Sequence, residues 1–290
     1  MSETPRAVLS VDFELFRHTP AYRTASGTMA DETVGLDGVA FLQSAFETHG
    51  VSTTWFTVSE LAETNPAAVE SIARAGHEIG SHTRTHRLLS ELDTDTRREE
   101  MRVSREALEA VSDAPVTGFR APAFDIAPGH FQDLAAAGYE YDASVVASRS
   151  IPGWYGGEFE LTEPAPATAV WDSAPPAIAE LPTSVMPGLR LPLTGTWLRF
   201  FGPRYTILGM RLLARRGVVP VLYVHPWEFV DLPSIEGVPK RVYWHTGAWM
   251  RRAIERILAT DFEFVTASEA LRQADLDTAA PDQGPNGATK

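Results

Sequence analysis

The chain has 290 residues, 44% of them hydrophobic, and a formal net charge of −13 at pH 7, so its composition is that of a globular protein. The negative charge argues against a nucleic acid or an anionic membrane as a partner, because both bind to basic surfaces. The sequence contains no cysteine, which excludes disulfides and cysteine nucleophiles and leaves only His, Asp and Glu as metal-ligating side chains.

The N-terminal stretch "MSETPRAVLSVDFE" is acidic and polar where a secretory signal would be basic, and no apolar segment follows it. No run in the sequence approaches the roughly 20 apolar residues of a membrane-spanning helix. We therefore expect a cytoplasmic protein without a transmembrane segment.

The first half of the chain alternates short apolar runs with segments of helical periodicity. Strands are expected at residues 6–13, 51–58, 77–81, 116–119 and 139–144. Helices are expected at residues 35–50, 65–76, 93–113 and 129–138. Pro66 and Gly76 stand at the two ends of the second helix, which is the usual placement of these residue types.

The second half begins irregularly and ends regularly. Residues 147–204 are rich in Pro, Gly and Trp, and we interpret them as long loops around one strand at 177–185. Further elements are expected as a helix at 205–217, a strand at 218–225, a helix at 246–260, and a strand followed by a helix within 262–273. Residues 277–290 have the composition of a disordered tail.

This alternation of strands and helices predicts parallel strands with helical crossovers. The seven or eight strands favour a closed or nearly closed α/β barrel, a distorted (β/α)7–8 barrel, formed by residues 1–276 as a single domain. In such barrels catalytic residues lie at the carboxyl ends of the strands. The ionisable residues of this sequence can be tested against that rule.

Ionisable residues follow five of the predicted strands. In chain order they are Asp12 and Glu14, His82 and His86 within "GHEIGSHTRTH", Arg120 in "FRAPAFD", Asp142 in "YEYDAS", and His225 with Glu228 in "LYVHPWE". Asp12 and Glu14 are two residues apart, so on an extended backbone they point to the same side. His82 and His86 are one helical turn apart and can face the same ion.

Each of these residues also has an ordinary structural interpretation. A histidine pair four residues apart is a weak signal by itself, and Arg120 alone could form a surface ion pair. Single histidines on loops are usually solvated, and we expect this of His18, His49 and His130. One metal site explains the residues at the strand ends jointly, whereas the structural interpretation needs a separate reason for each.

The chemistry of such a site points to hydrolysis. Two imidazoles and a carboxylate form an open divalent-metal site, which lowers the pKa of a bound water from 15.7 toward about 7. A second carboxylate held by Arg120 can act as general base, and His225, oriented by Asp142, can protonate a leaving amine. A backbone N–H of the "RAPAF" turn can stabilise the oxyanion. This combination suits cleavage of an amide or an ester.

The motifs resemble those of a known family. The stretches "VDFE", "TTWFTVSELAETNPAAVESIARAGHEIGSHTRTH", "FRAPAF", "YEYDAS" and "LYVHPWE" occur in the order and spacing of the polysaccharide deacetylase family, carbohydrate esterase family four. The resemblance extends over about residues 6–270 and is closest to the branch associated with exopolysaccharide and exosortase loci.

The resemblance implies a distorted barrel with one divalent metal ion, commonly zinc and sometimes cobalt or nickel, that removes N-acetyl groups from sugars. It implies the following roles: His82 and His86 as metal ligands, Asp12 as base with Arg120 as its partner, His225 as acid with Asp142 as its partner, and the N–H near Ala123 at the oxyanion.

One position departs from the family pattern. The common first motif has two adjacent aspartates, a base and a ligand, but Phe13 follows Asp12 here and Glu14 comes next. Either Asp12 is the base and Glu14 the ligand, which we prefer, or Asp12 is the ligand and there is no conventional base. Asp125 is a spare carboxylate that could assist in either case.

Several other residues are candidates for substrate contact. The aromatic residues Trp154, Tyr155, Trp197 and Trp244 lie in the loop regions, where packing is their usual role, but Trp154 and Trp197 could also stack on sugars. Ala123, Phe124 and Trp227 complete the set of residues that we expect at the substrate.

We therefore expect a metal-dependent hydrolase that removes N-acetyl groups from an amino sugar in a polysaccharide, a glycolipid or a glycan precursor. The alternatives are an allantoinase-like hydrolase of small amides from the same superfamily and a glycan-binding barrel that has lost its activity. The sequence leaves open the sugar, the linkage, the metal and the oligomeric state.

Overall fold

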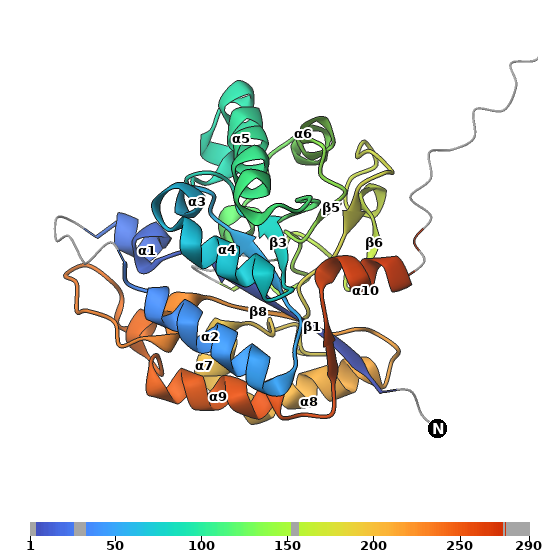
Figure 1. The fold of residues 1–290 in the computed structure, drawn as a ribbon. Helices are drawn as coiled ribbons and strands as arrows, with labels where there is room; N and C mark the ends of the chain where they lie inside the picture. The colour runs from blue at the N-terminus through green and yellow to red at the C-terminus, as the bar shows by residue number, and fades with distance from the viewer. Residues whose placement is uncertain (1–3, 26–32, 152–156, 275, 277–290) are drawn as a thin grey trace, which may run out of the picture.

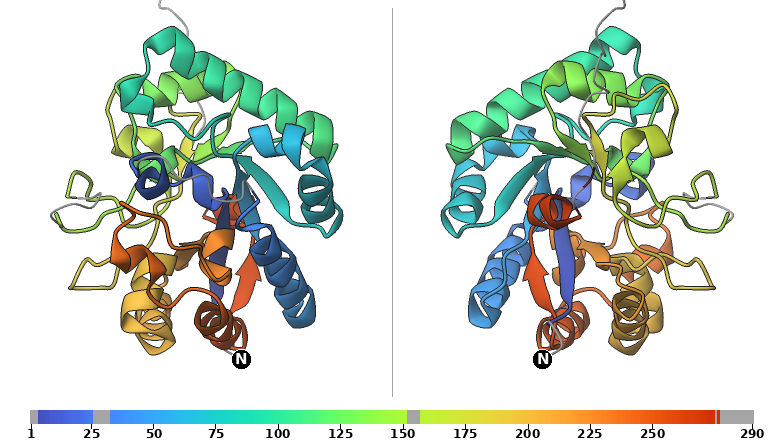
Figure 2. Two further views of the ribbon diagram at one scale, coloured as in Figure 1. Left: turned by 90° about the vertical axis from the view of Figure 1, so that its left-hand side faces the viewer. Right: turned by 90° about the vertical axis from the view of Figure 1, so that its right-hand side faces the viewer.

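The computed structural model describes residues 4–25, 33–151, 157–274 and 276. Trp154, Tyr155 and the expected tail at 277–290 lie outside these residues. One curled sheet and the helices around it make up the structure (Figures 1 and 2).

The described residues form a nine-stranded sheet in the order β6-β7-β5-β4-β3-β2-β1-β8, with β9 paired to β1. The strands are β1 Arg6–Phe13, β2 Thr54–Thr57, β3 Glu78–Ser81, β4 Gly118–Phe119, β5 Tyr141–Asp142, β6 Ala165–Pro166, β7 Ala179–Glu180, β8 Val221–Val224 and β9 Glu263–Val265. Neighbouring strands are parallel except for β6 and β7, which pair antiparallel.

Helices cover the outer side of the sheet (Figure 2). They are α1 Pro20–Arg23, α2 Leu36–His49, α3 Glu60–Thr64, α4 Pro66–Arg74, α5 Thr94–Ser112, α6 His130–Ala137, α7 Gly195–Phe201, α8 Pro203–Ala214, α9 Ala248–Leu258 and α10 Ala267–Gln273. Helices α5 and α6 lie at the opposite end of the molecule from α8 and α9 (Figure 1). Among the described residues no helix is both long and apolar enough to span a bilayer.

An irregular segment closes the gap between β7 and β8. The Ser184 N–H donates to the carbonyl of Val221 at 2.9 Å, and Thr194 forms a parallel bridge to Tyr223. Because β8 in turn pairs with β1, the sheet curls back toward its first strand. The predicted distorted (β/α) barrel is confirmed.

Strand β1 explains why this barrel has a polar end. Leu9, Val11 and Phe13 point outward into the main hydrophobic core under the helices. The alternate residues point the other way, where Val8 joins a second hydrophobic cluster and Asp12 reaches a cavity. The two-residue period of a strand therefore places Phe13 against Trp55, at 5.8 Å between ring centroids and away from the cavity.

The elements expected from periodicity are present, with shorter strands than the apolar runs suggested. The main miss lies in the region interpreted as long loops, where residues Gly195–Phe201 form α7. The segment "GTWLRFF" is too short and too aromatic to show a helical period, and Gly202 ends it with a φ of 80°.

Gly38 on α2 allows the helix to pack against the segment after β8. A Cβ atom at this position would lie 1.9 Å from the carbonyl oxygen of Pro226, and backbone cannot yield as a side chain would. We expect Gly38→Ala to lower the free energy of unfolding by about 1–3 kcal/mol, measured by urea denaturation. Ala40→Ser, at an exposed position of the same helix, is the control and should change it by less than about 0.5 kcal/mol.

Candidate metal centre

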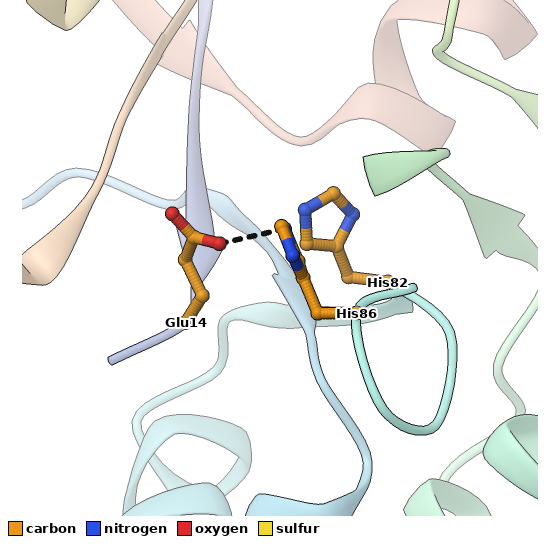
Figure 3. Close-up of side chains that lie close together, drawn as sticks. All are labelled: Glu14, His82 and His86. Carbon is orange, nitrogen blue, oxygen red and sulfur yellow. Dashed lines mark ion pairs between the residues drawn. The ribbon is translucent and has the colours of Figure 1, made fainter. Parts of the chain in front are cut away.

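Three buried side chains converge at the carboxyl end of the barrel. Glu14 follows β1, His82 follows β3, and His86 lies in the loop after it. One potential ligand atom from each lies within 4.8 Å of the other two (Figure 3). The sequence prediction of this group is confirmed as a cluster that could hold a metal ion.

The two histidines do not share a helix, although their spacing suggested one. They lie in a loop in which Thr83 and His86 have φ values of 63° and 57°. Glu100 accepts hydrogen bonds from the N–H groups of Arg84 and Thr85, both at 2.9 Å. Arg23 donates to the carbonyl of His86 at 2.8 Å. A loop held by hydrogen bonds with Glu100 and Arg23, rather than a helical turn, therefore brings the imidazoles together.

His82 is oriented by the backbone of Arg120. Its Nδ1 lies 2.7 Å from the Arg120 carbonyl oxygen, which fixes Nδ1 as the protonated nitrogen and leaves Nε2 with a lone pair. Burial lowers the pKa of His82 to about 4, so the ring is neutral at physiological pH. A neutral imidazole is the form that binds metal.

Glu14 presents one bound and one unbound oxygen. The Trp227 indole N–H donates to Oε1 at 2.9 Å. Oε2 is buried and, within the described residues, has no hydrogen bond of good geometry, although it lies 2.6 Å from Nε2 of His86. Burial alone would raise the pKa of Glu14, but the His86 imidazole lowers it below its usual range. An ionised, buried oxygen facing two imidazoles fits a divalent cation.

Asp12 and Arg120 form a buried ion pair beside this cluster. Arg120 Nη1 donates to Asp12 Oδ1 at 2.6 Å and to the Ser10 hydroxyl at 2.9 Å. Its guanidinium lies over the Phe56 ring, 4.2 Å from the centroid. The predicted pairing of Asp12 with Arg120 is present, and both Asp12 and Glu14 face the cavity, as their spacing predicted.

His225 has a different carboxylate partner from the one predicted. Its Nδ1 lies 3.3 Å from Glu228, which also receives the Nε–H of Arg199 at 2.8 Å. Burial opposes the imidazolium, but Glu228 outweighs it and raises the pKa of His225. Although burial acts against ionisation, Arg199 lowers the pKa of Glu228, so this carboxylate stays charged.

Asp142 makes other contacts. It lies 3.0 Å from Nε2 of His130 and accepts from the Ser144 hydroxyl at 2.6 Å. The predicted pairing of Asp142 with His225 is therefore replaced by the His225–Glu228 pair. His130, expected as a solvated loop residue, is fully buried, and so is His18, which contacts Glu60 at 2.7 Å. His49 is exposed, as expected.

The site opens into a cavity of about 620 Å³. Asp12, the triad, His225 and Trp227 line it together with apolar residues of α1 and of the segment around Val242. Ala123 and Phe124 also line it, with φ values of 52° and 59°, which is unusual for residues other than glycine. No hydrogen bond among the described residues uses the Ala123 N–H, so it is available to an oxyanion.

The other predicted contacts have mixed outcomes. Trp197 is buried and stacks on Phe201 at 5.6 Å, and it is not among the residues that line the cavity. Trp227 lines the cavity, but its indole N–H serves Glu14. Asp125 accepts a hydrogen bond from the Ser90 N–H at 2.7 Å and is not among the residues that line this cavity.

Two family models together match most of the sequence. Residues 39–141 match the model described as Polysaccharide deacetylase, and residues 145–272 match the Domain of unknown function (DUF3473). Within residues 39–141 the chain is therefore similar to polysaccharide deacetylases, and the DUF3473 region follows this segment. No curated protein matches the sequence.

Several solved structures share the fold. A protein named as a candidate polysaccharide deacetylase from Mycobacterium smegmatis is 23% identical, with 95% of this chain and 94% of that chain covered and a TM-score of 0.64. The Puue allantoinase is 16% identical, with coverages of 92% and 88% and a TM-score of 0.60. A CE4 family pseudoenzyme from Bacillus anthracis is 11% identical, with coverages of 93% and 66% and a TM-score of 0.51. At these identities the likeness shows the fold alone.

The DUF3473 region completes the barrel. Its residues include β6 to β9, of which β8 and β9 pair with β1 of the first half. It also carries Arg199, His225 and Trp227 to the cavity, with Glu228 behind His225. The cavity is therefore lined by residues of both matched regions and by Asp12 and Glu14, which precede them.

Sequence reasoning missed the contacts of Arg199 and Glu228 in this candidate site. The sequence places Glu228 just beyond His225, but the sequence analysis assigns Asp142, at the end of another strand, as the partner of His225. Arg199 lies on a helix that the sequence did not reveal, and "TWLRFF" carries no catalytic signal. In the structure Glu228 has 0% exposure, and a buried carboxylate needs a cationic partner. This burial points to Arg199, but it cannot be read from the sequence.

Trp227 should tune the affinity of the candidate site for a metal ion. Trp227→Phe keeps a ring beside His225 but removes the donor to Glu14 Oε1, and we expect metal affinity to fall by about 10- to 100-fold. Competition with a chromophoric chelator measures this. Trp197→Phe, a buried tryptophan without a contact to the triad, is the matched control and should leave metal affinity unchanged.

Two variants distinguish the His225–Glu228 pair from the predicted His225–Asp142 pair. Glu228→Gln removes the charge that raises the pKa of His225, so its imidazolium should titrate at lower pH, as followed by NMR of the ring protons. The variant also leaves Arg199 uncompensated, at a cost of about 3 kcal/mol of stability. Asp142→Asn should leave the His225 titration in place. A shift in Asp142→Asn and none in Glu228→Gln would restore the earlier assignment.

Proposed function

We propose that this protein is a metal-dependent hydrolase that removes the acetyl group from the amino nitrogen of an N-acetylated sugar. The observation that carries the proposal is the buried Glu14–His82–His86 cluster, whose Glu14 Oε2 lacks a hydrogen bond, beside an Asp12–Arg120 pair in the same cavity. The deacetylase family match supports the reaction class.

Glu14, His82 and His86 would hold the ion. The nitrogen and oxygen donors suit zinc, and we propose zinc, with cobalt or nickel as alternatives. When bound, such an ion supplies Lewis-acid polarisation of an oxygen and acidifies water. This assigns Asp12 to the base role that we preferred and Glu14 to the ligand role.

The residues around the cluster divide the remaining chemistry. Asp12, fixed by Arg120 at Oδ1, accepts the proton of the attacking water. The Ala123 N–H stabilises the negative charge on the acetyl oxygen. His225, whose imidazolium form is favoured by Glu228, protonates the sugar nitrogen as the C–N bond breaks. The products are acetate and a free amino sugar.

The substrate carrier belongs to the same proposal. We place the sugar in a polysaccharide, a glycolipid or an intracellular glycan precursor, and the chain in the branch associated with exopolysaccharide and exosortase loci. The motifs "VDFE", "FRAPAF" and "HPWE" support that branch. An allantoinase-like activity on small amides remains the second candidate, because the Puue allantoinase has the same fold.

Release of acetate from N-acetylhexosamine oligomers, with a small ureide as the competing substrate, tests the proposal. We expect turnover of the oligomers, its loss on chelation and its recovery on adding zinc. Turnover of the ureide alone would favour the second candidate. Glycan binding without turnover, and without any ion in the purified protein by mass spectrometry, would favour an inactive barrel.

Variants assign the roles within the site. His82→Ala and His86→Ala should each lose both the ion and turnover, since either leaves two ligands. Asp12→Asn should keep the ion while kcat falls by about 10²- to 10⁴-fold, as expected for loss of a general base. If Asp12→Asn loses the ion instead, Asp12 is a ligand and the base assignment is wrong.

A further inference from the structure

The acidic residues of this chain are unevenly distributed. Residues 181–227 contain no Asp or Glu, although the whole sequence has 38. The basic residues in this stretch are Arg190, Arg199, Arg204, Arg211, Arg215 and Arg216. Residues 237–254 also lack acidic side chains and contain Lys240, Arg241, Arg251 and Arg252. A protein of net charge −13 therefore has two segments that are purely cationic.

The same two segments hold the exposed apolar side chains. Among the described residues the large hydrophobic side chains that are exposed are Leu189 at 53%, Phe201 at 50%, Leu208 at 53% and Trp244 at 56%. Burying such residues is favourable, so a cluster of them outside the core indicates a surface that is covered in some state.

Packing contacts place these side chains on elements that adjoin one another. Trp244 lies against Phe200, with ring centroids 5.6 Å apart, and the neighbouring Phe201 contacts Tyr205 on α8 at 4.9 Å. On the buried side of α8, Gly209 faces Met186, the residue that begins the turn carrying Leu189. Trp244 is therefore packed beside α7, and the turn of Leu189 is packed beside α8.

Arginines extend this surface along α8. Arg204, Leu208, Arg211 and Arg215 are spaced by four, three and four residues, so they share one face of the helix, and all are exposed. Arg211 has one acidic neighbour, Asp261, 3.7 Å away. We call Leu189, Phe201, Leu208 and Trp244, with Arg204, Arg211 and Arg215, the α7–α8 surface.

We propose that the α7–α8 surface docks on a membrane that contains anionic lipids. Tryptophan and other apolar side chains partition into the bilayer interface, and arginines beside them bind anionic headgroups. All acidic residues lie outside residues 181–227 and 237–254, so the excess negative charge of the rest of the chain disfavours other orientations on the same lipids. The net charge of the whole chain argues against an anionic membrane, but it does not reflect the positive charge of this one surface.

The α7–α8 surface adjoins the candidate site. The carbonyl of Trp244 accepts a hydrogen bond from Arg199 at 3.0 Å, and Arg199 lines the cavity with Arg241 and Val242. Docking would therefore bring the cavity mouth close to the lipid surface. Membrane binding itself does not depend on the proposed function, so the two can fail separately.

Co-sedimentation of the full chain with vesicles tests the docking. We expect binding to vesicles of phosphatidylcholine with about one-third phosphatidylglycerol, little binding to phosphatidylcholine alone, and weakening as salt is raised. Equal binding to both vesicles, or to neither, would overturn the proposal. Deacetylase assays on soluble oligomers give an independent readout of the proposed function.

Charge variants locate the surface. Each arginine at an anionic surface contributes roughly fivefold, so the triple variant Arg204→Gln, Arg211→Gln and Arg215→Gln should bind roughly a hundredfold more weakly. The control triple Arg74→Gln, Arg87→Gln and Arg102→Gln removes the same charge from exposed positions elsewhere and should bind more weakly by less than about threefold. Equal loss in both would overturn the assignment of this face.

Trp244→Ala tests the apolar contribution and a competing occupant. We expect it to weaken vesicle binding while the protein stays monomeric by sedimentation, because its side chain is more than half exposed. If the native chain instead self-associates, Trp244→Ala dissociates it and vesicles are not bound, the surface is covered by a second copy and the membrane proposal is wrong.

Discussion

The polar end of the barrel depends on the hydrogen bonds that Arg120 makes. Arg120 follows β4 with 0% exposure, and its groups reach β1 and the residues that follow β3 and β5. Its Nη1 holds Asp12 and Ser10 of β1, its Nε–H donates to the carbonyl of Ala143 after β5, and its own carbonyl orients His82 after β3. A buried guanidinium is tolerable only when ionised and hydrogen-bonded partners surround it. The arrangement that satisfies Arg120 is therefore the arrangement that fixes the proposed base and one proposed ligand.

The second constraint is that the two halves of the chain share one candidate cation site. The first half provides Glu14 and both histidines, but Trp227 from the second half fixes Glu14 Oε1. Glu228 and Arg199, also from the second half, hold His225 near the same carboxylate, with 3.7 Å between His225 Nε2 and Glu14 Oε1. Gly195 permits this packing, because a Cβ there would lie 2.0 Å from Glu228 Oε2. The region without an assigned function thus supplies the surroundings of the proposed acid.

Much of the fold and of the metal cluster follows from local sequence patterns, and the remainder depends on contacts between distant segments. The alternation along β1 placed Asp12 and Glu14 on one side and explained Phe13. The partner of His225 could not be found in this way, because Asp142 and Glu228 both follow strands and only three-dimensional packing chooses between them. The prediction that His18 and His130 are solvated is wrong for the same reason. Their buried positions depend on Glu60 and Asp142, distant in sequence from each of them.

Net charge is an average, and here it conceals how the charge is arranged. The acid-free stretch 181–227 is bounded by Glu180 and Glu228, and both of these are fully buried. Burial and the nearby Asp142 raise the pKa of Glu180 well above its usual value, and Glu228 is paired with Arg199. Neither glutamate offsets the exposed arginines of α8. The exposed charges of residues 181–227 are therefore all positive. The acidic residues that give the chain its negative net charge lie in other segments.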